Sequence, residues 1–144
     1  MLVSNEKNSD SPVTITAFLF LESEKLTIEQ ISERLGISPD SCRRKGDLNK
    51  AGKPFLHSSW KIKSERHLSE DADEVVVGLN DCLRDLFSRV ENHQDRFRQL
   101  ACEEEAGLLI GILADHVPPM IINGDMLERF SSLKLNHLAI DLIT

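Results

Sequence analysis

Residues 13–20 read Val13-Thr14-Ile15-Thr16-Ala17-Phe18-Leu19-Phe20, a run rich in β-branched and aromatic side chains. Such residues favour a strand over a helix because they pack well on a pleated surface. Successive side chains of a strand alternate between its two sides, so Ile15 and Leu19 would face one side and Phe18 and Phe20 the other. Since both sides are largely apolar, the run predicts a strand in the interior of a sheet.

A helix follows this strand and carries sequence signals at both ends. Thr27 and Gln30 stand three residues apart, as in a capping box, and Gly36 can adopt the left-handed conformation that closes a helix. Ser38-Pro39-Asp40 then predicts a turn. Residues 45–57 predict an exposed loop because Gly, Asn and Pro interrupt them repeatedly.

A second strand and the longest helix come next. Trp60 and Ile62 alternate with lysines, which is the period of a strand with one buried and one solvated face. An inward indole would need a hydrogen-bond partner for its ring N–H, or an exposed ring edge. From Ala72 to Val90, apolar residues recur at helical spacing and predict a long amphipathic helix that can break and restart at Asn92-His93.

The remaining chain predicts four elements in succession, namely a buried strand at 108–114, a strand at 120–123 that forms a hairpin with it, a short helix at 126–133 and a final strand at 138–143. Leu138, Ile140 and Leu142 are expected to point inward. A hairpin excludes a purely parallel sheet. We therefore predict an α+β fold with a mixed, largely antiparallel sheet of about five strands, packed by one long and two shorter helices in a ferredoxin-like style.

Length and composition predict one soluble domain. A chain of 144 residues, 40% of them hydrophobic, can bury one core. We expect residues 1–12 to form a disordered tail and residues 13–144 to form the domain. With neither an 18-residue apolar run nor a signal peptide in the sequence, we expect a cytoplasmic protein.

Three cysteines stand far apart, so the spacing offers neither a disulfide framework nor a Cys-x-x-Cys pair. Cys42 precedes Arg43, Arg44 and Lys45, and neighbouring cations make a thiol more reactive. Residues 43–67 carry a net charge of +6, whereas the rest of the chain carries −13. If these cations share one exterior face, they would attract an anionic ligand or an acidic partner, although solvated surface charges are the simpler interpretation.

The familiar catalytic motifs fail when they are tested against the residues. Gly46 to Lys53 has glycines and a lysine, but the glycine spacing and Pro54 do not fit a phosphate-binding loop. His57 stands beside Ser58 and Ser59 without the other parts of a hydrolase site. The histidine spacing offers no zinc-binding pattern, and the absence of tyrosine argues against a nucleic-acid partner. We predict no catalytic residue, metal site, cofactor or membrane association.

Four stretches taken together resemble the bacterial family called domain of unknown function 4279; they are residues 31–40, Lys45-Gly46-Asp47, Ser59-Trp60-Lys61-Ile62 and Leu138-Ala139-Ile140-Asp141-Leu142. The resemblance covers nearly the whole chain. It implies a compact α+β domain in a bacterial cytoplasm and brings no established activity, cofactor or catalytic residue. It also implies signature positions, which are Arg44, Lys45, Gly46, Asp47 and Trp60.

Our working hypothesis is a non-catalytic binding or protein-interaction domain that recognises an acidic protein or a small anionic ligand. Its candidate binding residues are Arg43, Arg44, Lys45, Gly46, Asp47 and Trp60. An immunity-type protein that neutralises a toxin is one concrete form of this hypothesis. The alternative is an enzyme in which Asp47 or His57 acts as acid or base on a small anionic substrate held by residues 43–47. A deep cleft where Asp47, His57 and Trp60 converge would favour the enzyme.

Overall fold

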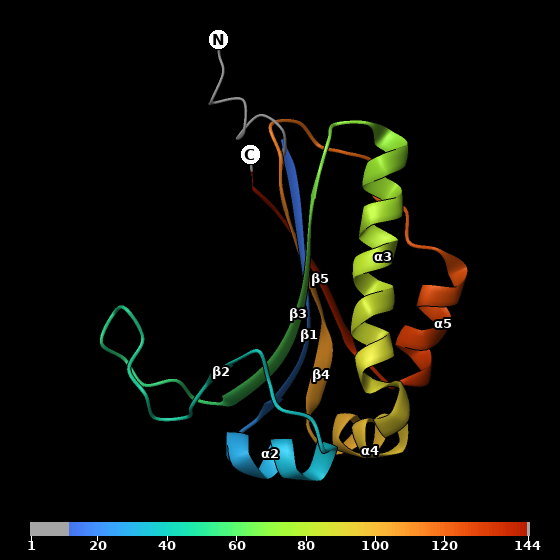
Figure 1. The fold of residues 1–144 in the computed structure, drawn as a ribbon. Coiled ribbons are helices and arrows are strands. Elements are labelled where there is room, and N and C mark those ends of the chain that lie inside the picture. Colours follow the sequence, from blue (N-terminus) through green and yellow to red (C-terminus); the bar gives the residue numbers. More distant parts are fainter. Residues whose placement is uncertain (1–11, 144) are drawn as a thin grey trace.

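A five-stranded sheet with helices on one side forms the protein in the computed structural model, which describes residues 12–143 (Figure 1). Its strands are β1 (Val13–Ser23), β2 (Ser41–Arg43), β3 (Ser58–Leu68), β4 (Glu105–Leu113) and β5 (His137–Ile143). Its helices are α2 (Ile28–Leu35), α3 (Ala72–Val90), the 3-10 turn η1 (Glu91–His93), α4 (Gln94–Glu103) and α5 (Gly124–Ser132). The predicted disordered tail lies, apart from Pro12, outside the described residues. The predicted α+β class with a mixed five-stranded sheet is confirmed.

β1 is the central strand, as its two apolar sides predicted. The strand order is β2-β3-β1-β4-β5, and β1 pairs antiparallel with both neighbours over most of its length. Alternate residues of β1 are fully or nearly fully buried and the others are half-buried. The buried set faces the helices, whereas the half-buried set lies on the opposite side of the sheet, which we call the outer face.

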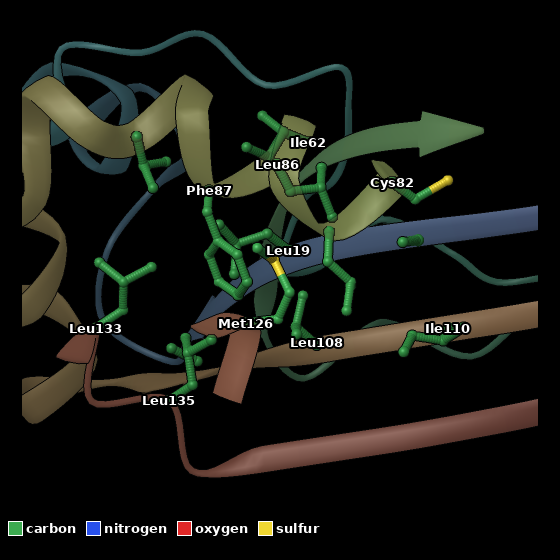
Figure 2. Close-up of a cluster of buried hydrophobic side chains, with 14 of the residues drawn as sticks. Leu19, Ile62, Cys82, Leu86, Phe87, Leu108, Ile110, Met126, Leu133 and Leu135 are labelled. Carbon is green, nitrogen blue, oxygen red and sulfur yellow. The ribbon is translucent and has the colours of Figure 1, made fainter. Parts of the chain in front are cut away.

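The core lies between the sheet and the helices. Apolar side chains of β1, β3, β4, α3 and α5 meet there, as Figure 2 shows for Leu19, Ile62, Phe87, Leu108 and Met126. Burial of these side chains is the main stabilising contribution, at roughly 1.5–3 kcal/mol for each fully buried large residue. Because α3 and α5 lie along this side and α2 and α4 lie at one end of the sheet, the outer face of the sheet is left open (Figure 1).

The helix ends follow the sequence signals. Thr27 and Gln30 form a reciprocal capping box at α2, and Gly36 closes that helix at a φ of 77°. The long helical stretch breaks at η1, which contains the predicted position Asn92-His93, before α4 continues to Glu103. No helix among the described residues is long and apolar enough to cross a membrane.

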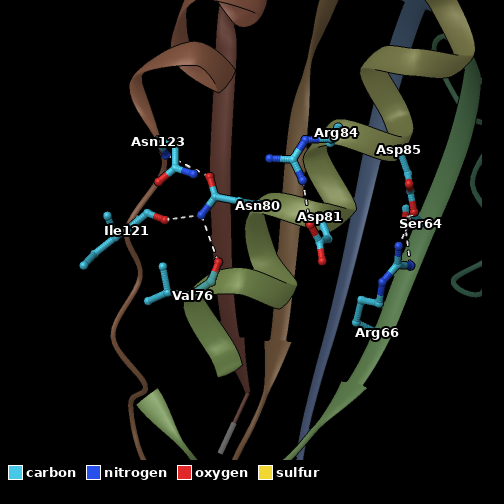
Figure 3. Close-up of polar contacts among 9 residues, drawn as sticks. All are labelled: Ser64, Arg66, Val76, Asn80, Asp81, Arg84, Asp85, Ile121 and Asn123. Atoms are coloured by element: carbon cyan, nitrogen blue, oxygen red, sulfur yellow. Dashed lines mark hydrogen bonds and ion pairs between the residues drawn. The ribbon is translucent and has the colours of Figure 1, made fainter. Parts of the chain in front are cut away.

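The predicted hairpin strand at 120–123 is wrong. Residues 114–123 form no strand, and α5 instead carries the chain across to β5, which pairs parallel with β4. Pro118 and Pro119 have no N–H to donate to a strand pair. The buried side chain of Asn80 on α3 binds the Ile121 carbonyl at 2.7 Å and the Asn123 N–H at 2.8 Å (Figure 3). The backbone groups that a strand would need are therefore bound to a helix side chain.

Two further expectations also need correction. Leu138 and Ile140 were expected to point inward, but they are 44% and 45% exposed. They lie on the helix-facing side, opposite Leu108 and Ile110 of β4, but β5 is an edge strand that the helices do not cover. The short strand β2 was missed, because its three exposed residues carry no pattern of burial.

Candidate functional site

Between β2 and β3 the predicted exposed loop at 45–57 is confirmed, and hydrogen bonds order its backbone as a hairpin. The Gly46 N–H donates to the Phe55 carbonyl at 2.9 Å, and the Phe55 N–H donates to the Asp47 carbonyl at 2.8 Å. At its tip, the Asn49 side chain accepts hydrogen bonds from the N–H groups of Ala51 and Lys53. Gly46 adopts a φ of 95°, a conformation open to glycine. The hairpin projects from the sheet on the side away from the helices (Figure 1).

The three consecutive basic residues at its base point to different partners. The Arg43 guanidinium lies 5.3 Å from the centre of the Phe55 ring and forms no ion pair within residues 12–143. Arg44 instead pairs with Glu29 on α2 at 2.6 Å, and Lys45 donates to the Glu24 carbonyl at 2.9 Å. The contact between Arg44 and Glu29 lowers the pKa of the Glu29 carboxyl. Of the three, Arg43 is the one directed at the hairpin, and among residues 12–143 neither Arg43 nor Lys45 forms an ion pair.

The side chains of the remaining predicted site residues do not form a binding site together with Arg43. Gly46 and Asp47 shape the hairpin through their backbone groups. Trp60 is fully buried on the helix-facing side, opposite Leu21 of β1, and its indole N–H has no hydrogen-bond partner in the described part of the chain. Trp60 is therefore a residue of the core between sheet and helices and does not reach the surface.

The other predicted cations are also dispersed. Arg66 lies on the helix-facing side, where Figure 3 shows its contacts with Asp85 and Ser64, and Lys63 lies 3.7 Å from Glu65. Lys61 lies over the Phe18 ring at 5.4 Å on the outer face. The condition that these cations share one exterior face is therefore not met, because strand alternation and nearby acids divide the charges.

A smaller site remains where the hairpin meets the outer face. A depression of about 570 Å³ opens there, which we call the hairpin hollow; its lining residues are Glu22, Arg43, Asn49, Lys53, Pro54, Phe55, Leu56, His57 and Ser59. Ser59 stands between Glu22 of β1 and Arg43 of β2 in the strand register. It is only 3% exposed, and its hydroxyl has no hydrogen-bond partner among the described residues.

Cations outnumber acids around this hollow. Burial lowers the pKa of Lys61, the positive charge of Arg43 lowers it further, and the carboxylate of Glu22 acts in the opposite direction. Arg43 and Lys61 are therefore close enough to repel one another, and the carboxylate of Glu22 offsets part of their positive charge. Their mutual repulsion favours an added negative charge near Arg43.

Sequence reasoning missed Ser59 and Phe55 as site residues. Ser59 enters the sequence analysis only beside His57 and in the family resemblance, although its place two residues before Lys61 puts it on the same face of the strand. The sequence has no comparable signal for Phe55, which reaches Arg43 only because the hairpin folds back on itself.

The residues of the alternative enzyme hypothesis are not brought together. His57 lines the hollow, with its Nε2 atom 3.6 Å from the Glu24 carboxylate, while Asp47 and Trp60 do not line it. The described residues contain no group of three or more potential metal ligands. Cys42 and Cys102 are exposed, and Cys82 is buried, which raises the pKa of its thiol.

Comparison with known proteins shows one family. The family described as Domain of unknown function (DUF4279) matches residues 13–137, which is nearly the whole chain. Neither the curated proteins nor the solved structures contain a match to this chain.

Proposed function

Because the chain belongs to the DUF4279 family, whose description assigns no activity, we propose a function from its surface: a non-catalytic binding domain that takes an anionic group in the hairpin hollow. The anionic group would be a carboxylate or a phosphate. It would belong either to a small molecule or to an acidic segment of a partner protein.

The observation that carries this proposal is the position of Arg43 opposite Ser59 in the register of β2 and β3, beside a serine hydroxyl that has no partner among the described residues. A buried hydroxyl without a partner costs about 1–3 kcal/mol, and an anion oxygen beside Ser59 would remove that cost. The Arg43 guanidinium offers several N–H groups in a planar fork that matches carboxylate and phosphate geometry. Phe55 lies against the guanidinium and limits the directions in which it can point.

The shape of the site indicates modest affinity. The hollow is open to solvent and one of its lining residues, Glu22, is itself an acid that would repel the ligand. An open site also leaves a bound anion partly hydrated, which weakens each ionic contact. We therefore expect dissociation constants in the range from about 10 µM to 1 mM.

We also propose a bacterial cytoplasm as the setting of this domain. The family resemblance supports the bacterial origin, and the exposed thiols Cys42 and Cys102 suit a reducing compartment. The immunity-type role stays a prediction within this proposal.

The test is a titration in which binding is measured from the changes in backbone amide chemical shifts by NMR. Inorganic phosphate is one probe and a hexaglutamate peptide is the other. Shifts confined to the hollow are expected with at least one probe, and their relative size distinguishes a small anion from an acidic protein segment. Arg43→Gln should weaken binding about tenfold or more, since a charge-assisted hydrogen bond contributes about 1.5–3 kcal/mol. Arg44→Gln is the matched control and should change affinity less than about twofold, because Arg44 is bound to Glu29.

Ser59→Ala separates binding from stability. It should weaken binding while raising the free energy of unfolding by about 1 kcal/mol, because it removes an unpaired buried hydroxyl. Equal binding by the Arg43→Gln and Arg44→Gln variants would refute the proposal. Hydrolysis of a phosphate monoester that disappears in His57→Ala would replace it with the enzyme alternative.

A further inference from the structure

The edge strand β5 is unusually open. It is seven residues long, it ends the sheet beside β4, and six of its seven residues are exposed. The labelled core side chains in Figure 2 come from the other strands, the helices and the turn before β5, and none comes from β5 itself. A free edge presents unpaired backbone N–H and C=O groups that can pair with another strand.

The sequence of β5 lacks the usual protection of an edge strand. His137-Leu138-Ala139-Ile140-Asp141-Leu142-Ile143 contains no proline or lysine and one acid. Natural edges are commonly blocked by lysine, proline, bulges or short length. The other edge of this sheet, β2, has three residues and leads directly into the projecting hairpin. Of the two edges of the sheet within residues 12–143, β5 is the one long and regular enough to accept a partner strand.

We infer that β5 pairs antiparallel with the β5 strand of a second copy, which joins the two sheets into one continuous sheet around a two-fold axis at Ala139. Such an axis places Leu138 opposite Ile140 of the second copy, and these side chains are 44% and 45% exposed in one copy. Directly opposite side chains on one face of an antiparallel pair lie close enough to pack, so this contact removes apolar surface from water. The two-fold symmetry repeats that contact on both sides of the axis.

Charge complementarity selects a second copy as the occupant. The same axis places His137 opposite Asp141 of the second copy on the outer face, again twice. His137 already lies 3.3 Å from Glu105 and is stacked on Phe20 with ring centres 6.4 Å apart, so its ring is held in place beside the free edge. An axis one residue later, at Ile140, would instead put Asp141 opposite Ala139 and leave the carboxylate without a partner.

Overall charge opposes this association and limits its strength. Each chain has a net charge of −7, so two copies repel at long range. At 0.15 M salt the screening length is about 8 Å, so this long-range repulsion is largely screened. The contacts at the strand edge then contribute most of the association free energy. We therefore expect a reversible dimer with a dissociation constant on the order of 1–100 µM, a range typical of small interfaces.

Sedimentation velocity of the full chain at 0.15 M salt tests the dimer between about 1 µM and 1 mM protein. The wild type should shift from monomer to dimer, and Ile140→Lys should raise the dissociation constant at least about tenfold, because a charge at an edge blocks pairing. Val77→Lys is the matched control, since Val77 is an exposed apolar residue on α3, and it should leave the dimer unchanged. A wild type that is monomeric throughout, or a dimer that survives Ile140→Lys, would overturn the inference.

Disulfide trapping tests the register. The Ala139→Cys substitution, made in a background of Cys42→Ser and Cys102→Ser, would place the two introduced thiols opposite each other across the axis. Opposite residues of antiparallel strands have Cα atoms about 4.5–5.5 Å apart, within the range of a disulfide. Copper-phenanthroline oxidation should link Ala139→Cys dimers much faster than Asp141→Cys dimers. Equal rates, or faster linkage through position 141, would refute the axis at Ala139.

Discussion

Gly107 and Gly111 form a matched pair that tests how closely β5 is fitted to the rest of the sheet. Both lie on β4, on the outer face, and both are opposite β5 residues, His137 and Asp141 respectively. A Cβ atom added at Gly107 would lie 2.5 Å from the His137 carbonyl oxygen and 2.9 Å from the Phe20 ring. A Cβ atom added at Gly111 would have its nearest neighbour at 3.8 Å, an ordinary contact.

The expected effects of alanine therefore have opposite signs. Replacing a strand glycine with alanine stabilises the fold by about 0.5–1 kcal/mol, because the unfolded chain loses backbone freedom. At Gly107 this gain is outweighed by overpacking, which typically costs about 1–3 kcal/mol and is severe here because the His137 carbonyl belongs to the backbone. We expect Gly107→Ala to lower the free energy of unfolding by about 1–2 kcal/mol and Gly111→Ala to raise it by about 0.5 kcal/mol.

Urea unfolding monitored by the fluorescence of Trp60, the only tryptophan, measures both changes. All variants are compared at one low protein concentration, because self-association would add a concentration-dependent contribution to stability. Adding Phe20→Ala separates the two contacts, since it removes the ring but not the carbonyl. If Gly107→Ala proves as stable as Gly111→Ala, the close fit between β4 and β5 does not exist as described.

Three further outcomes are expected. The pKa of Asp40 is lowered chiefly by its hydrogen bond with Arg89, and its carboxylate also accepts the Lys63 N–H at 2.7 Å. Its charge therefore stabilises the fold above the unfolded pKa of about 4, and that contribution is lost as the pH falls through the lower folded value. Asp40→Asn should cost about 1 kcal/mol at pH 7, and the difference from wild type should shrink in urea titrations below about pH 4. A thiol reagent should label Cys42 and Cys102 rapidly in the native protein and Cys82 only on unfolding, and rapid labelling of all three would contradict its burial. Acrylamide should barely quench native Trp60 fluorescence, and strong quenching would contradict the 0% exposure of that side chain.

Local signals in the chain were enough to predict most of the individual elements. The apolar sides of residues 13–20 predicted the central strand, and Thr27, Gln30 and Gly36 predicted both ends of α2. These predictions succeeded because strand alternation, helix capping and helix closure each depend on residues within a few positions of one another.

Contacts between distant parts of the chain decided what local signals could not. The segment at 120–123 reads as a strand, but Asn80, more than forty residues away, binds its backbone groups. Leu138 and Ile140 have the spacing of buried residues, yet they are exposed because β5 occupies an edge that no helix covers. Arg43 and Arg44 are neighbours in the chain, but they meet different partners. Arg44 pairs with Glu29 of α2, whereas Arg43 lies over the Phe55 ring of the hairpin. Alternation shows which residues share a face, but burial and charge pairing depend on which element lies against that face, and only the folded chain determines this.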